Sequence, residues 1–112
     1  MQDTPKRIKR LVREWAGIAH DRELQKALLD LRAHFDHWQR AEITAGELND
    51  LIHRFHDGDS RTIWKKYATN HLEPALGSAV ATGIIRRDEL PSELLQHIAG
   101  LIEFYEAEES AP

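Results

Sequence analysis

A helical repeat of apolar side chains in the first half of the chain is the feature that most constrains the fold. Between about Arg22 and Arg40, large apolar residues recur at steps of three and four positions. They fall within about 80° of arc on a helix that turns roughly 100° per residue, and they are Leu24, Leu28, Leu31, Phe35 and Trp38. This pattern predicts an amphipathic helix over residues 22–40 that buries the apolar arc.

Before this segment, the same repeat predicts a helix that begins at Thr4 and Pro5, because Thr is a good N-cap and Pro suits the first helical position. Its apolar residues continue as far as Ile18. Asp21 either caps a second helix or lies inside one helix that continues to Arg40, and both arrangements remain open.

Four further helices are predicted in the second half of the chain. Thr44 and Glu47 form a capping-box pattern that begins the first of them. Gly58, in the segment "DGDS", is predicted to end it. Capping residues and prolines predict that the other three helices begin near Arg61, Pro74 and Pro91, and the last of them ends near Glu106.

These five or six helices predict an all-α fold, a compact single-domain bundle of short-to-medium helices. The domain would span residues 1–112, with frayed ends at about 1–4 and 107–112. A length of 112 residues is close to the commonest domain size. The last helix has a wide apolar side, which predicts either a central position in the bundle or a dimer contact.

Composition excludes several classes of protein. The chain has no cysteine, so it has no disulfide framework and no thiolate chemistry. No stretch approaches the roughly 20 apolar residues that span a bilayer, and the first residues lack the apolar core of a secretion signal. We therefore expect a cytoplasmic protein and disfavour a membrane as its partner.

Charge is unevenly distributed, although the net charge is only −4. Residues 1–22 carry six Lys or Arg, whereas residues 88–112 carry seven acids and neither Lys nor Arg. The basic start and the acidic end either lie near each other and partly neutralise, or face different partners.

Three stretches carry a family resemblance: "FDHW…EITAGELNDLIHRFHDGDSR", "WKKY" and "GIIRRDELPSELLQHI…IEFY". Together they resemble a group of small, uncharacterised bacterial proteins, from about Leu24 onward. The resemblance implies a stand-alone helical domain of bacterial origin. It implies no activity, cofactor, partner or site residue.

Two histidine pairs are the candidates for a metal site, because imidazole and carboxylate groups one helical turn apart bind divalent metals. The candidate ligands are His34, His37, Asp50, His53 and His56. Helical phase counts against this alternative, since most of these side chains point away from the predicted apolar arcs. We predict no cofactor, and keep a divalent metal as the alternative.

A helical ribonuclease is a related alternative. Arg13 with His20, or Arg32 with His37, is similar to the Arg-x(4–6)-His pattern of HEPN-type nucleases. In such a pair, Arg would hold phosphate charge and His would move a proton. The pattern is loose in a chain with seven His, so we assign no catalytic residue.

Nucleic-acid binding is the other alternative. The candidate contacts are Lys6, Arg7, Lys9, Arg10, Arg13, Arg61, Lys65 and Lys66. Lys and Arg neutralise phosphates, and aromatic side chains can stack on bases. However, the sequence pI is near 5.9, whereas nucleic-acid-binding domains are typically basic. Trp64 and Tyr67 are expected in the core.

The leading prediction is a non-enzymatic helical domain with a protein-interaction or regulatory role, whose partner is another protein or a second copy in a homodimer. It is based on the separation of charge, the broad apolar side of the last helix and the aromatic side chains that suit interfaces. Those aromatic residues are Trp15, Trp38, Phe104 and Tyr105.

Overall fold

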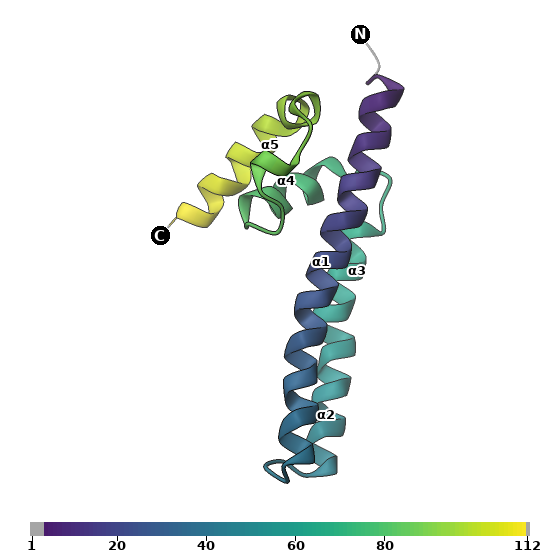
Figure 1. Ribbon diagram of the computed structural model, residues 1–112, viewed down its shortest axis with the longest axis vertical. Helices are drawn as coiled ribbons and strands as arrows, with labels where there is room; N and C mark the ends of the chain where they lie inside the picture. Colours follow the sequence, from purple (N-terminus) through teal and green to yellow (C-terminus); the bar gives the residue numbers. More distant parts are fainter. Residues whose placement is uncertain (1–3, 112) are drawn as a thin grey trace. The chain divides into compact units, whose positions relative to one another are not determined.

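The computed structural model describes residues 4–111, in which every regular secondary-structure element is a helix and there is no strand (Figure 1). This confirms the predicted all-α class for the described part of the chain. The elements are α1 (Lys6–Gln39), α2 (Ala45–Phe55), the π-helical turn η1 (His56–Ser60), α3 (Arg61–Tyr67), α4 (Glu73–Ala81), the 3₁₀ turn η2 (Arg87–Glu89) and α5 (Ser92–Ser110).

Apart from the 3₁₀ turn η2, the described residues form four continuous helical runs rather than the predicted five or six helices. α1 passes through Asp21 without a break, so one helix occupies the segment where two were an open alternative. α2, η1 and α3 also follow one another directly and make one run over residues 45–67.

The predicted stop at Gly58 is wrong. A glycine ends a helix when it adopts a positive φ angle, and the only described glycine with a positive φ is Gly83. Phe55, Ser60 and Arg61 around it keep right-handed helical angles. The segment "HDGDS" therefore widens the helix into a π turn instead of ending it. Such insertions occur often at functional sites.

The contacts group the chain into two compact units. The first combines the start of α1, up to His20, with the chain from Thr69 onward, and the second is Asp21–Ala68. We call the second one the hairpin unit. Whether the whole chain behaves as a single domain stays a prediction.

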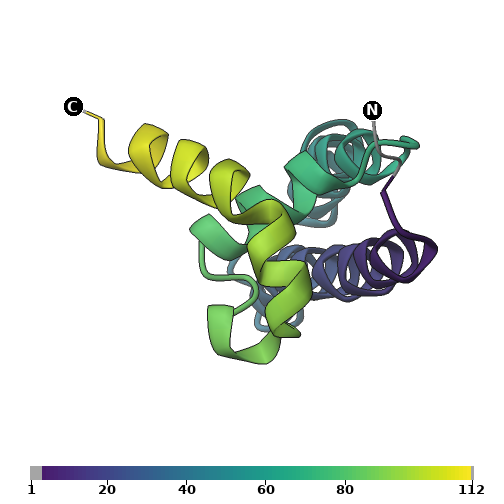
Figure 2. The same cartoon turned by 90° about the horizontal axis from the view of Figure 1, so that it is seen from above.

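The first unit is built around α5. Leu94, Ile98 and Ile102 are completely buried, so the apolar side of this helix has the central position that was one of its two predicted roles. α4 packs closely against it (Figure 2). A Cβ atom added at Gly77 would lie only 2.8 Å from the Leu101 Cβ atom.

α5 also extends further than the sequence predicts. It continues to Ser110 instead of ending near Glu106, so the predicted fraying at 107–112 is not seen up to residue 110. The predicted fraying at residues 1–3 and 112 lies outside the described residues. Arg7 pairs with Glu93 at 2.5 Å, so the basic start and acidic end of the chain do meet at this point.

The hairpin unit is an antiparallel pair of helical rods. The second part of α1 runs beside α2–η1–α3 in the opposite direction (Figure 1). The predicted capping box at the start of α2 is confirmed: the Glu47 N–H donates to Thr44 Oγ1, and the Thr44 N–H donates to Glu47 Oε1, each at 3.1 Å. Across residues 4–111, no helix is both long and apolar enough to cross a membrane.

Candidate functional site

The hairpin unit has two sides of different chemistry. Leu28 follows the buried Ala27, and Trp64 follows the buried Ile63, along their helices. Each is therefore turned by roughly 100°, in the same rotational sense, from a side chain that faces the other rod. In an antiparallel pair of helices, the same rotational sense leads to the same side of the pair. Leu28 and Trp64 thus lie on one side.

Two further side chains lie on this side. Phe35 is turned roughly 80° from Ala27, and Ile52 roughly 40° from the buried Leu48, in that same sense. All four of these large side chains are exposed. We call this surface the apolar side of the hairpin; it comprises Leu28, Phe35, Ile52 and Trp64.

Trp64 is the most exposed residue of the apolar side, at 63%, which contradicts its predicted place in the core. Phe35 and Trp38 are also exposed, and Leu28 is 50% exposed. The predicted burial of the whole apolar arc of α1 is therefore wrong in this part. One neighbouring rod covers only one edge of an arc that is about 80° wide.

Two recesses border the apolar side. One, of about 440 Å³, lies along α1 between Asp21 and Arg32, and both Leu28 and Leu29 line it. The other, of about 370 Å³, is lined by His56, Ser60, Arg61 and Trp64. The apolar side is therefore indented and has charged groups at its edges.

We call the opposite side of the hairpin the polar side. Its residues are turned from the buried Ala27, Leu48 and Ile63 in the opposite rotational sense. It contains an open recess of about 250 Å³ between α1 and the π turn. Four of its lining residues are charged or titratable, namely Asp30, His34, Arg54 and Asp59. The sequence did not predict that Arg54 and Asp59 line a recess with α1, and Asp59 lies in the π turn, which the sequence did not predict either.

A polar cluster joins the two rods next to this side. Lys66 Nζ donates to Glu23 Oε1 at 2.8 Å, and the Tyr67 hydroxyl donates to Glu23 Oε2. Only 15% of the Glu23 side chain is exposed. Burial, followed by the hydrogen bond to Glu23, raises the pKa of Tyr67 well above its usual value. Tyr67 was predicted in the core; its side chain is partly buried, and its hydroxyl links the second rod to Glu23 on α1.

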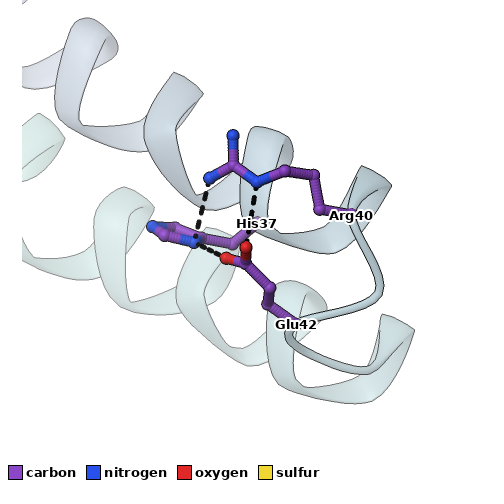
Figure 3. A network of polar contacts seen from close by, with 3 residues as sticks. All are labelled: His37, Arg40 and Glu42. Carbon is purple, nitrogen blue, oxygen red and sulfur yellow. Dashed lines mark hydrogen bonds and ion pairs between the residues drawn. The ribbon is translucent and has the colours of Figure 1, made fainter.

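His37 belongs to a third polar group, at the end of α1 (Figure 3). Its Nδ1 contacts Glu42 Oε2, and Arg40 Nε donates to Glu42 Oε1 at 3.0 Å. A carboxylate only accepts hydrogen bonds, so this contact is a hydrogen bond when the His37 Nδ1 carries a proton. The hydrogen bond from His37, and next that from Arg40, lower the pKa of Glu42.

The structure does not bring the candidate metal ligands together. His34 lines the polar recess, His56 lines the recess beside Trp64, and His37 pairs with Glu42. Asp50 and His53 are exposed on α2. Among the described residues, no three His, Asp or Glu side chains form a group that could hold a metal ion.

The candidate nuclease pair Arg32 and His37 is also divided. Arg32 borders the recess along α1, while His37 is held by Glu42 at the helix end. Arg13 and His20 both lie on α1, in the first unit.

The candidate nucleic-acid contacts are distributed over both units. Those at the start of α1 belong to the first unit, where Arg7 pairs with Glu93 and Arg10 lies 3.7 Å from Glu14. Lys66 is in the hairpin unit and pairs with Glu23. Arg61 and Lys65 are exposed on α3, on either side of Trp64 in the chain.

Comparisons with known proteins found no matching family model, curated protein or solved structure. The resemblance to small bacterial proteins therefore stays an expectation from the sequence.

Proposed function

We propose that this chain is a protein-binding helical domain, and that it docks its partner on the apolar side of the hairpin unit. One observation carries the proposal. The hairpin unit buries only three hydrophobic residues, Ala27, Leu48 and Ile63, while six of its large hydrophobic residues are exposed. In the first unit the balance is reversed, since its large apolar residues are mostly buried.

The chemistry of the apolar side is that of a protein interface. Trp is among the residues most enriched at the centres of interfaces, and charged residues at the rim add specificity. Fully burying a large apolar side chain contributes about 1.5–3 kcal/mol. About half of each of the four side chains is exposed, so a partner that buries all four contributes on the order of 4 kcal/mol of binding free energy before the costs of association.

A photo-crosslinking amino acid tests this proposal. Placed at Phe35, on the apolar side, it is expected to give protein adducts in the source cells. At Leu29, which is 55% exposed but turned roughly 200° from Ala27, it is expected to give few or none. Equal yields at both positions, or no adduct at either, would reject the proposed function.

The exposure of Trp64 supports a second candidate function, the binding of single-stranded nucleic acid. Arg61 and Lys65 are both exposed near this ring, and a base can stack on an exposed indole while cations neutralise the phosphates. Binding of this kind falls steeply as salt rises. This candidate predicts that the wild-type chain binds a labelled oligonucleotide at low salt, that added salt releases the oligonucleotide, and that the Trp64→Ala variant binds it weakly. No binding to the wild type at low salt would exclude this candidate.

A further inference from the structure

We propose that the partner on the apolar side is a second copy of this chain, so that two hairpin units pair as a four-helix bundle. This inference rests on the proposed function and specifies its partner. Two antiparallel rods form a single helix–helix contact, and bundles of four helices give each rod a second neighbour. The exposed residues of the apolar side lie where this second neighbour would pack.

The positions on the two rods support a further pair of helices rather than a single peptide. Leu28 and Phe35 come from α1, Ile52 from α2 and Trp64 from α3. The apolar side therefore extends over both rods and over most of their length. One docked helix would cover the groove between the rods, whereas a second hairpin presents two rods to two rods.

The size of the surface also fits a stable dimer. The run over residues 45–67 has a length of about 34 Å at 1.5 Å per residue, and two helices side by side are about 20 Å wide. The product is on the order of 700 Å². A standard interface buries about 800 Å² on each partner, so one side of the hairpin has nearly the area that is required.

Charge does not oppose the pairing of two identical units. Residues 21–68 contain nine acids and eight Lys or Arg, a net charge of −1, so the repulsion between two copies is weak.

The polar side is poorly suited to the same contact. Glu23, Lys66, Arg54 and Asp59 lie on it or next to it, and burying their charges costs free energy unless each is paired. Glu23 and Lys66 already pair within the chain. The dimer contact should therefore use the apolar side alone.

Sedimentation equilibrium of the full chain, over a hundredfold range of concentration, tests the inference. The wild-type mass should rise with concentration from 12.9 kDa towards twice that value. Leu28→Glu places a charge on the apolar side and should weaken association by at least about tenfold. Leu29→Glu is the matched control, a neighbouring leucine of similar exposure that is turned roughly 100° further from the second rod than Leu28, and it should change association by no more than about twofold.

Circular dichroism shows whether Leu28→Glu still folds. If its helicity falls, Trp64→Ser replaces it in the test, because that side chain is mostly exposed in the single chain and is not needed for its core. A monomeric wild type at every concentration, or equal association of wild type and the apolar-side variant, would overturn the inference. Adducts to other proteins at Phe35 in cells would then still support the proposed function, whereas their absence would reject both.

Discussion

His37 and Glu42 are joined through both main chain and side chain at the end of α1. The Glu42 N–H donates to the His37 carbonyl at 2.9 Å, and the Ala41 N–H donates to the Trp38 carbonyl at 3.0 Å. These two bonds form a Schellman motif. An apolar contact usually accompanies this motif at the two positions that His37 and Glu42 occupy; here the imidazole and carboxylate meet instead.

The pKa of Glu42 should depend chiefly on His37. NMR titration of the carboxyl group should give a pKa below the ordinary value of 4.5 in the wild type. His37→Ala should return it towards 4.5, and Arg40→Ala should have a smaller effect, because the His37 hydrogen bond is the largest cause of the shift. A value that does not move in His37→Ala would contradict this account.

The same pair predicts the direction of an acid effect. A carboxyl whose pKa is lower in the folded state stabilises the fold above its unfolded pKa, and this contribution is lost as pH falls through the folded value. Below about pH 4.5, the free energy of unfolding of the wild type should therefore fall by more than that of the Glu42→Gln variant. The effect is small, because the pair is exposed to solvent.

Ala41→Gly should stabilise the chain by about 0.5–1 kcal/mol. Ala41 has a φ of +59°, a conformation that glycine adopts without the steric cost of a Cβ atom. Urea unfolding measures the change. Ala33→Gly, at an exposed position inside α1, is the control and should destabilise by a similar amount. If both variants lose stability, the left-handed position carries no strain.

Gly77→Ala should destabilise the first unit by about 1–3 kcal/mol. Its Cβ atom would lie 2.8 Å from the Leu101 Cβ atom and 3.3 Å from the Leu101 backbone carbon, so α4 and α5 would have to separate. Gly100→Ala, where a Cβ atom meets nothing within 4 Å, should instead be neutral or stabilising. Thermal unfolding of the two variants checks the contrast, and equal stability would refute the close approach.

Tyr67→Phe should destabilise the hairpin unit by about 1 kcal/mol, since it removes the hydroxyl that donates to the mostly buried Glu23. The raised pKa of Tyr67 stabilises the fold below the ordinary value of 10.0, and this contribution is lost as pH rises above it. The wild type should therefore lose stability above about pH 10 more steeply than the variant does. Parallel pH profiles of urea midpoints would contradict the assignment.

Local signals in the sequence predicted local structure well. The capping box at Thr44 and Glu47 depends on residues three apart, and both of its hydrogen bonds are present. The helical phases also showed correctly that His37 and His53 lie away from the buried sides. These features depend on neighbours in the chain, which the sequence displays directly.

Features that depend on distant residues were predicted less well. Glycine at position 58 indicated a stop, but the backbone around it keeps right-handed helical angles, and the helix continues as a π turn. Periodicity identified the apolar arc of α1 but not the single rod that covers one edge of it. Because each rod of the hairpin has only one neighbouring rod, Trp64 stays exposed and forms part of the proposed binding surface.

Hydroxyl-radical footprinting of Trp64 tests the central claim, that the apolar side of the hairpin is a protein-binding surface, most directly. The account predicts that Trp64 and Leu28 react quickly in the dilute, purified chain and become protected in concentrated protein or in extract of the source cells, while Leu29 stays reactive throughout. Protection that appears at high concentration of the purified chain indicates the second copy, and protection only in extract indicates another protein. Full reactivity of Trp64 and Leu28 under every condition would contradict the account.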